Sequence, residues 1–346
     1  MQAMKKRILL LICLVCAFAL LSLLFPSKNL SVHFLNVGQA DSAIVLCDDK
    51  VLMIDGGNPS DSSFIFSYLK HTLGIDHIDY IIATHPHDDH IGGLSGALNA
   101  CTVGALFSPV VQYDSKAFSS LTKYTQKQGI PICVPQVGDS FPLGSATVEF
   151  LSPQNAFDDL NDCSLVVRIA YGNTSMLFTG DAQFDAELAM VDSQQMLQST
   201  LLKVGHHGSD TSCSLEFLRE ITPEYAIISV GKENTYGHPS EIVLNRLSDI
   251  GATVYRTDLH GTIICSSDGN KLSFSTEKGT NTPPLQPISS AVSVIDTPYV
   301  GNINSKKLHF ATCPSVSDMK EKNKVPFTEK EDALKNGYSP CKACNP

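Results

Sequence analysis

Three histidines and an aspartate fall within six positions of this sequence, in the order His-x-His-x-Asp-His. They follow a mostly apolar run over 78–83, which predicts a buried strand. Because the end of a strand fixes the backbone, the loop after it can point four side chains at one place. Imidazole and carboxylate groups together suit zinc, manganese or iron. We predict that His85 and His87 hold one divalent ion and that Asp89 and His90 hold a second, a pair that can activate water for hydrolysis.

Two further strand ends supply the other candidate ligands. The predicted strand 176–178 is followed by Asp181, whose carboxylate is placed to bridge two ions. The predicted strand 201–204 ends just before His206 and His207. We prefer His206 as the ligand, and His207 is then expected to face the substrate or to support the fold.

Other polar residues have roles that the sequence leaves more open. Asp55 is expected to orient a metal ligand rather than to bind the ion itself. Lys203 is a candidate for contact with an anionic substrate, although a lysine at a strand edge is usually solvated. His238 is as suited to lining the pocket as to binding metal. Asp89 is also a candidate for handling the proton of the attacking water, and Asp88 is expected to be exposed.

The order of the predicted elements indicates an α/β fold. The first part of the chain is rich in predicted strands, and later strands alternate with helices. Two sheets sandwiched between helices would satisfy that order. The predicted helices cover about 61–73, 91–99, 183–191, 214–220 and 240–250.

These residues resemble a known family. The metallo-β-lactamase superfamily has the same set of motif residues, here Asp55, His85, His87, Asp89, His90 and Asp181. Five segments are similar, in the same order, to the ComEC-like hydrolases, named after a DNA-uptake channel protein of competent bacteria: 32–42, 161–165, 178–181, 203–209 and 236–239. The match covers about 30–275, and we expect a hydrolase similar to the free-standing relatives that have no channel domain. The resemblance implies an αββα sandwich and a metal-dependent phosphodiesterase or nuclease outside the cytoplasmic membrane, and it suggests a link to DNA uptake.

One position departs from the superfamily pattern. The usual histidine of the third motif is absent, and Asn161-Asp162 stands roughly in its place. The ion held by His85 and His87 is therefore short of one protein ligand, unless Asp162 or water supplies it. The first motif keeps all its histidines, which favours metal binding over a degenerate scaffold.

The N-terminal segment differs in kind from the rest. Lys5, Lys6 and Arg7 precede an apolar run over 8–25 that is interrupted only by Ser22. Its 18 residues are just enough to span a bilayer. We expect an uncleaved membrane anchor with the later residues outside the cytoplasm, and a cleaved secretion signal is the alternative.

The C-terminal segment contains a second candidate metal site. His309, Cys313, Cys341 and Cys344 form two close pairs, as a closed tetrahedral zinc site requires. The segment resembles the N-terminal metal-binding domain of the DNA-repair protein Ada, which uses four cysteines and accepts a methyl group on the first. Here His309 stands at that first position, so methyl transfer is not expected and a structural zinc remains. A disulfide is the alternative in an exported protein.

The chain therefore divides into four predicted parts: an anchor (1–27), a hydrolase domain (28–276), a linker (277–297) and a zinc-binding module (298–346). The middle of the chain carries a net charge of −16 and the C-terminal module +3, so tight and extended contact with nucleic acid is not expected of the hydrolase domain. We expect two divalent ions, zinc or else manganese, in the hydrolase domain and one zinc in the module. DNA or another phosphodiester is the expected substrate, and no phosphate-binding glycine loop indicates a nucleotide cofactor. The alternatives are hydrolysis of small or envelope-linked esters, such as phosphorylcholine esters, and a non-catalytic binding module in DNA uptake.

Overall fold

The computed structural model describes residues 29–279, 283–287, 298–320 and 323–346. The predicted anchor lies outside these residues, as does much of the predicted linker. Among the helices of the described residues, none is both long and apolar enough to cross a membrane.

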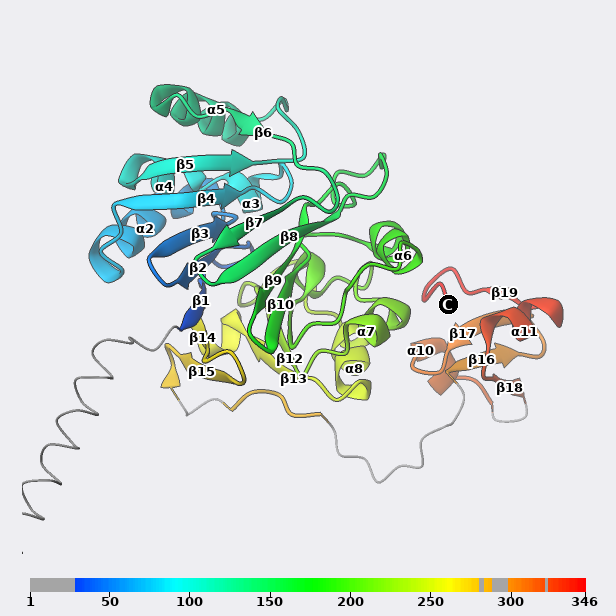
Figure 1. Ribbon diagram of the computed structural model, residues 1–346. Helices are drawn as coiled ribbons and strands as arrows, with labels where there is room; N and C mark the ends of the chain where they lie inside the picture. The colour runs from blue at the N-terminus through cyan, green and yellow to red at the C-terminus, as the bar shows by residue number, and fades with distance from the viewer. Residues whose placement is uncertain (1–28, 280–282, 288–297, 321–322) are drawn as a thin grey trace, which may run out of the picture.

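The first sheet has eight strands in the order β15-β14-β1-β2-β3-β4-β5-β6. Pairing is antiparallel from β15 to β3 and parallel from β3 to β6. Its strands are β1 (Leu30–Phe34), β2 (Ala43–Cys47), β3 (Lys50–Ile54), β4 (His77–Ile82), β5 (Thr102–Phe107), β6 (Ile132–Cys133), β14 (Ile263–Ser267) and β15 (Leu272–Thr276). Helices cover its outer face (Figure 1): α2 (Ser62–Ser67), flanked by η1 (Pro59–Asp61) and η2 (Tyr68–Thr72), then α3 (Asp88–Ile91), α4 (Leu94–Ala100) and α5 (Lys116–Gln128).

The second sheet has seven strands in the order β13-β12-β11-β10-β9-β8-β7. Strands β10 to β13 are parallel to one another, and the remaining pairs are antiparallel. Its strands are β7 (Ser140–Leu143), β8 (Ala146–Ser152), β9 (Val166–Tyr171), β10 (Thr174–Phe178), β11 (Leu201–Lys203), β12 (Tyr225–Ile228) and β13 (Thr253–Arg256). Three longer helices, α6 (Phe184–Asp192), α7 (Leu215–Ile221) and α8 (Glu241–Asp249), cover this sheet, and η3 (Gly205–Gly208) and α9 (Thr257–His260) follow β11 and β13.

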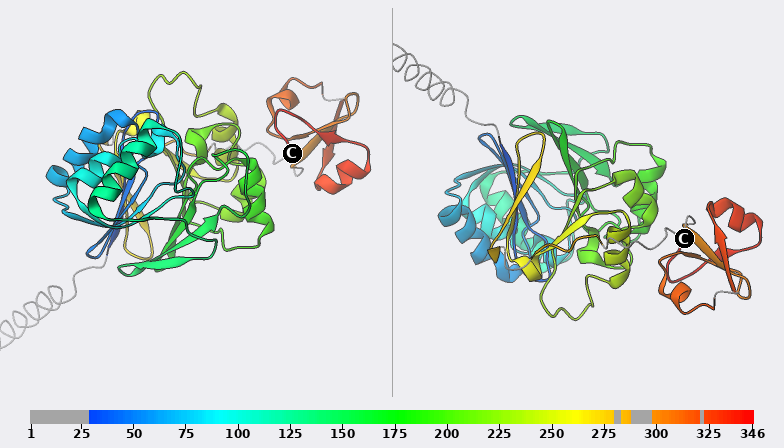
Figure 2. Two further views of the ribbon diagram at one scale, coloured as in Figure 1. Left: turned by 90° about the horizontal axis from the view of Figure 1, so that it is seen from above. Right: turned by 90° about the horizontal axis from the view of Figure 1, so that it is seen from below.

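The two sheets pack face to face, with helices on both outer sides (Figure 2). Alternate residues of the strands point into the space between the sheets, where Phe34 of β1 stacks on Phe178 of β10 with ring centres 5.8 Å apart. Two further apolar clusters fill the space between each sheet and its helices. The predicted αββα sandwich is confirmed, and the five predicted helices lie within a few residues of their expected places. Neither α5 nor the strands β5, β6, β7, β13, β14 and β15 were predicted from the sequence.

Residues 298–346 form a separate small sheet of four strands, in the order β18-β16-β17-β19. This C-terminal module has its own apolar core, which also includes Leu215 of α7. Tyr299 donates a hydrogen bond from its hydroxyl to Glu216 of the same helix, with 3.2 Å between the oxygens. The module consists of β16 (Tyr299–Asn302), β17 (Lys307–Phe310), α10 (Pro314–Ser317), β18 (Lys324–Phe327), α11 (Lys330–Lys335) and β19 (Ser339–Pro340).

Candidate metal centre

The loop after β4 carries the predicted histidine motif, and its shape is fixed by Asp55 at the end of β3. The Asp55 carboxylate accepts hydrogen bonds from the Thr84 amide (2.8 Å) and the Thr84 hydroxyl (2.7 Å). Its Oδ2 also lies 2.8 Å from Nδ1 of His90, which is fully buried. Because Nδ1 of His90 donates to Asp55, the Nε2 atom that faces the centre of the site carries the lone pair when the ring is neutral. Asp55 therefore orients a candidate ligand, as the sequence suggested.

His85 and His87 face each other across the first candidate ion site. Nε2 of His85 lies 3.0 Å from Nδ1 of His87. The other nitrogen of His85 is within 3.2 Å of the Thr84 hydroxyl and 3.4 Å of the Ser164 hydroxyl. These hydroxyls can hold the ring, so both facing nitrogens are available to share one cation.

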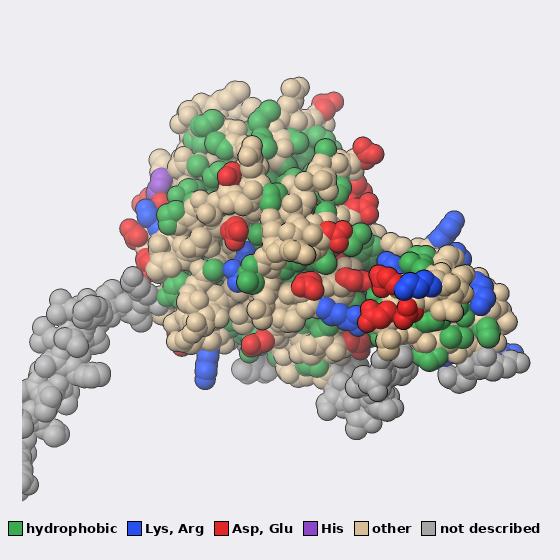
Figure 3. Space-filling model, turned by 45° about the vertical axis from the view of Figure 1, so that its right-hand side comes forward, with side chains coloured by type: hydrophobic (Ala, Val, Ile, Leu, Met, Phe, Trp, Pro, Cys, Tyr) green, Lys and Arg blue, Asp and Glu red, His purple; other side chains and the backbone are tan. Residues whose placement is uncertain are grey.

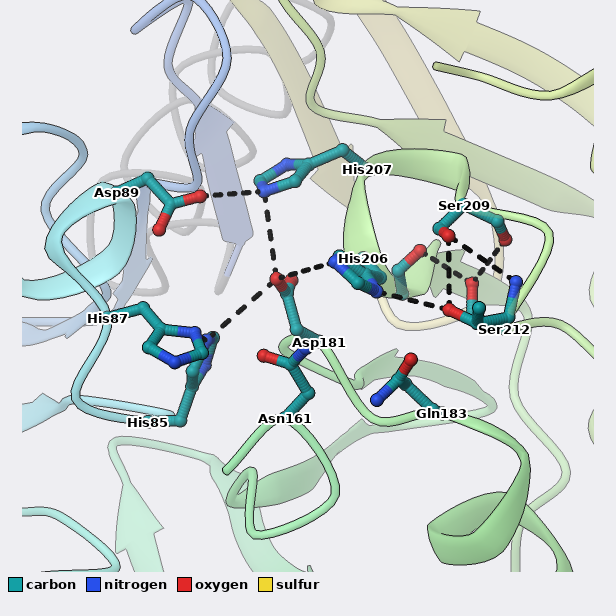
Figure 4. A network of polar contacts seen from close by, with 12 residues as sticks. His85, His87, Asp89, Asn161, Asp181, Gln183, His206, His207, Ser209 and Ser212 are labelled. Atoms are coloured by element: carbon teal, nitrogen blue, oxygen red, sulfur yellow. Dashed lines mark hydrogen bonds and ion pairs between the residues drawn. The ribbon is translucent and has the colours of Figure 1, made fainter. Parts of the chain in front are cut away.

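Asp181 lies at the centre of the arrangement (Figure 4). Its Oδ1 is 3.2 Å from Nε2 of His90. Its Oδ2 is 3.8 Å from the Nε2 atoms of His85, His206 and His207. One carboxylate therefore reaches nitrogens from the loop after β4 and from the turn after β11, which is the position of a bridging ligand.

The two histidines after β11 are both near Asp181, but they differ in setting. His207 is buried; its Nδ1 lies 3.0 Å from the Ser229 carbonyl oxygen, and its Nε2 lies 3.2 Å from Oδ2 of Asp89. The His206 side chain is 25% exposed. Ligand atoms of Asp89, His90, Asp181 and His207 all lie within 4.8 Å of one another. This geometry reverses our preference, because it makes His207 the candidate ligand and leaves His206 at the open side.

Both histidines adopt left-handed backbone angles, with φ of 48° at His206 and 53° at His207. Non-glycine residues seldom do so, and such strain is found mostly at functional sites. Because of these backbone angles, the His207 ring and not the His206 ring enters the interior. The direction of β11 alone does not distinguish the two histidines.

Lys203 does not have the role that the sequence suggested. Its side chain is 5% exposed, and its Nζ lies 2.7 Å from Oδ2 of Asp41 and 2.8 Å from the Val204 carbonyl oxygen. The ammonium group is therefore neither solvated nor free to meet a substrate. The sequence reading missed Asp41, although it lies within a segment that resembles the family.

Asp162, the predicted replacement for the third-motif histidine, faces another way. Its Oδ1 accepts hydrogen bonds from the backbone amides of Gln183 (2.8 Å) and Ala186 (3.3 Å) at the start of α6. Its neighbour Asn161 extends toward Asp181 instead (Figure 4). Within the described part of the chain, the buried Oδ1 of Asn161 has no hydrogen-bond partner. Asn161 is therefore the better candidate for the missing ligand.

The electrostatics of the cluster follow from its crowded carboxylates and imidazoles. Burial lowers the pKa of His207, but the charges of Asp181 and Asp41 outweigh this and raise it to about 10. Burial raises the pKa of Asp89, but a hydrogen bond with His207 and the charge of His90 bring it down to about 2. The pKa of His90 also rises, because Asp181 and Asp55 outweigh its burial. Without a metal ion, protons on these imidazoles balance the carboxylates.

The donor set fits divalent metal ions. Nε2 of His90 and Oδ1 of Asp181 approach to 3.2 Å without hydrogen-bond alignment, so neither buried atom has a partner among the described residues. Buried polar atoms are normally satisfied, and a cluster of orphans indicates an absent ligand. Nitrogen and carboxylate oxygen donors suit zinc or manganese.

Comparison with known proteins supports this assignment. The sequence profile of the Metallo-beta-lactamase superfamily matches residues 35–232. The ComE operon protein 3 of Bacillus subtilis is 31% identical over 269 residues, which cover 72% of this chain and 34% of that protein. The competence protein ComA of Neisseria gonorrhoeae is 29% identical over 240 residues, covering 69% of this chain and 32% of that protein. This chain thus spans about a third of the length of these relatives. Among solved structures, the metallo-beta-lactamase fold protein YhfI of Bacillus subtilis superposes with a TM-score of 0.46 at 14% identity, covering 69% of this chain and all of that one.

Proposed function

Because this chain belongs to the metallo-β-lactamase superfamily of metal-dependent hydrolases, we propose that it is a phosphodiesterase that cleaves nucleic acid outside the cytoplasmic membrane. The observation that carries the proposal is the position of Asp181. Its carboxylate lies within 3.8 Å of four histidine nitrogens that come from both sheets. Such a carboxylate can join two cation sites of the kind used in phosphodiester hydrolysis.

The candidate ligands would form two ion sites. His85, His87 and Asn161 would hold one ion; Asp89, His90 and His207 would hold the other, with Asp181 shared. When bound, such ions make a water nucleophilic near neutral pH and stabilise negative charge on the group attacked. The Asp89 side chain is 34% exposed and reaches the open edge of the site, but its lowered pKa of about 2 suits it to holding the ion more than to taking up a proton.

The open side of the site offers a surface for a nucleobase. His206 lies against His238, with ring centres 5.8 Å apart, and His238 in turn stacks on Tyr236 at 5.8 Å. Tyr236 is 70% exposed. A base next to the scissile phosphate could stack on this ring, and such stacking contributes about 1–3 kcal/mol per base. A small ester without a base would gain nothing from it.

The loop that carries Tyr236 is held in a defined shape. The Asn234 amide donates to the carbonyl oxygens of Gly231 (3.0 Å) and His238 (2.7 Å), and its oxygen accepts from the amides of Tyr236 and His238. The Gly231 amide donates to Gln39 in the loop between β1 and β2, at 3.0 Å. The exposed ring therefore sits on an ordered support, which lowers the entropic cost of binding.

Surface charge, the relatives and the N-terminal sequence pattern bear on the substrate and on the location of the enzyme. In the face shown in Figure 3, acidic side chains are scattered over the hydrolase domain with a few Lys and Arg among them, and on the right-hand side basic side chains lie next to acidic ones. One of these relatives is named a competence protein, which supports nucleic acid as the substrate. The extracytoplasmic location rests on the basic and apolar sequence pattern of residues 1–27.

We propose that the C-terminal module binds one structural zinc ion. Ligand atoms of His309, Cys313, Cys341 and Cys344 lie within 4.8 Å of one another, and all three cysteines carry free thiols. The Cys344 thiol and His309 lower the pKa of Cys313 to about 4, so a thiolate is present at neutral pH. Two or more thiolates with an imidazole form a strong zinc site. Without a cysteine at position 309, the site has no counterpart of the thiolate that Ada-like proteins methylate.

The test is metal-dependent cleavage of single-stranded DNA, measured beside cleavage of bis-p-nitrophenyl phosphate. DNA cleavage that is abolished by a chelator and restored by zinc or manganese supports the proposal. Cleavage of the small ester alone points to the small-ester hydrolase, and cleavage of neither points to a binding protein. Asp181→Ala should lose activity on both substrates, and Asp88→Ala is the control, because Asp88 is an aspartate within the histidine motif whose side chain is exposed.

A further inference from the structure

A buried ion pair lies directly behind His207. Nζ of Lys203 and Oδ2 of Asp41 are 2.7 Å apart, and both side chains are nearly inaccessible, at 5% and 7%. Burying two charges is costly, and a pair of well-packed neutral residues is often at least as stable. The pair therefore calls for an explanation other than stability.

Both members of the pair are joined to the metal centre. Lys203 ends β11, four residues before His207. Asp41 belongs to the loop between β1 and β2, and its backbone amide donates to the Asp89 carbonyl oxygen at 3.1 Å. Oδ1 of Asp41 lies 3.3 Å from Nδ1 of His207. One side of the His207 ring thus meets two acceptors, Asp41 and the Ser229 carbonyl oxygen at 3.0 Å.

This surrounding determines which nitrogen of His207 keeps its hydrogen when the ring is neutral. When a cation occupies the Nε2 side, the remaining ring hydrogen stays on Nδ1, which faces only acceptors, and the lone pair of Nε2 points toward Asp89 and Asp181. Metal ligands of this type usually have such a partner, and its loss typically lowers metal affinity 10- to 100-fold.

Lys203 explains why Asp41 does not bind a cation itself. Oxygens of Asp41 and Asp55 lie within 4.8 Å of a His90 nitrogen, so these three residues also resemble a small metal site. The ammonium group of Lys203 already supplies the positive charge beside Asp41. It also holds Oδ2, which leaves Oδ1 turned toward His207.

We propose that Asp41 and Lys203 are positioning residues that fix the orientation and tautomer of His207 and thereby set the affinity of the Asp89/His90/His207 metal site. They touch neither substrate nor metal. The inference rests on the proposed metal-dependent function but concerns one of its two ion sites only. The site at His85 and His87 should not depend on the pair.

The test compares the double variant Asp41→Asn/Lys203→Met with the parent in the full chain. The double variant removes both charges, so neither is left buried without its partner as in the single variants. Zinc affinity is measured for each hydrolase-domain equivalent by chelator competition. We expect one equivalent to bind 10- to 100-fold more weakly and the other to be unchanged. Nitrogen-15 NMR of the His207 ring at the same limiting zinc concentration should show Nε2 bound to zinc and the hydrogen on Nδ1 in the parent, and a larger fraction of unbound ring in the variant.

The matched control is Arg256→Met/Asp258→Asn, which removes another partly buried ion pair outside the His/Asp cluster. It should leave both zinc affinities unchanged. The inference is overturned if the Asp41/Lys203 variant keeps both affinities, or if both fall together with a lower melting temperature, since a merely structural role would act that way. If the parent itself binds no zinc in its hydrolase domain, the proposed function and this inference both fail. If the parent binds zinc and cleaves DNA while the variant equals it, the inference alone fails.

Discussion

Metal uptake by this protein should release protons, and most of them should come from one half of the centre. His207 has a pKa raised to about 10, because the carboxylates of Asp181 and Asp41 outweigh the effect of burial. The pKa of His90 is raised for the same kind of reason by Asp181 and Asp55. The pKa of His85 is instead lowered by burial and by the charge of His90. A zinc ion takes the lone pair of a neutral imidazole, so it must displace protons from His90 and His207 but not from His85.

The size of the effect follows from the His207 pKa. With a pKa of about 10, removing this proton at pH 7 costs about 4 kcal/mol. Zinc affinity at the Asp89/His90/His207 site should therefore rise about tenfold per pH unit between about pH 7 and 9 from His207 alone. Release of the His90 proton makes this dependence steeper, toward about a hundredfold per unit.

The same shifts determine the stability of the metal-free protein. The raised pKa of His207 contributes stability that is fully present below the unfolded value of 6.5 and is lost as the pH rises through about 10. The lowered pKa of Asp89 contributes stability that is present above 3.8 and is lost as the pH falls through about 2. These two groups therefore favour the metal-free fold most between about pH 4 and 6.5, whereas stabilisation by zinc should grow above that window.

Isothermal titration calorimetry in two buffers with different ionisation enthalpies counts the released protons. At pH 7 we expect one to two protons for the equivalent that fills the Asp89/His90/His207 site, and about none from His85 for the other. His207→Gln should remove about one proton from the count, and Asp88→Ala should leave it unchanged. A count near zero for both equivalents, or an affinity independent of pH, would refute the reasoning.

Three other predictions concern single features of the structure. Asn161→Ala should weaken zinc binding at the His85/His87 site about tenfold or more, whereas Asp162→Ala should lower the unfolding free energy by about 1 kcal/mol without that loss. Chelator competition and thermal melting separate the two effects, and equal zinc binding in the parent and in Asn161→Ala would contradict the assignment. His309→Ala should remove one zinc equivalent and expose residues 298–346 to proteolysis, with the two hydrolase-domain equivalents retained, as metal analysis and mass spectrometry of the fragments would show. Tyr236→Ala should raise the KM for single-stranded DNA about 5- to 150-fold, as the loss of one stacked base predicts, whereas Tyr236→Phe should resemble the parent; an equal effect on an oligonucleotide with abasic sites would argue against stacking.

The sequence was most informative where the determinants of structure are local. A short apolar run followed by His85, His87, Asp89 and His90 identifies a strand end that carries ligands, because the strand pattern and the donors lie within a dozen residues. Asp181 could be predicted for the same reason, since it directly follows Gly180 at the end of a predicted strand. These positions need only strand direction and residue type, and both can be read from sequence.

Residues whose roles depend on distant partners were harder to predict. Lys203 was a candidate for substrate contact, with a solvated side chain as the alternative, because its neighbours along the chain do not reveal Asp41, which lies more than 150 positions earlier in the sequence. Asn161 and Asp162 are adjacent, and only the start of α6 determines which of them turns away from the site. The choice between His206 and His207 depends on two left-handed backbone angles that residue types did not indicate.

The arrangement of the centre also explains why these long-range contacts matter. His85, His87, Asp89 and His90 extend from the first sheet, and Asp181 and His207 extend from the second. Metal binding is therefore coupled to the packing of one sheet against the other. A backbone hydrogen bond also joins the two halves of the sandwich: the Leu165 amide donates to the Thr84 carbonyl oxygen at 2.8 Å. Such contacts hold the ligands in place before any ion binds. Folding therefore orders the site in advance, and less of the free energy of metal binding is lost in ordering the side chains.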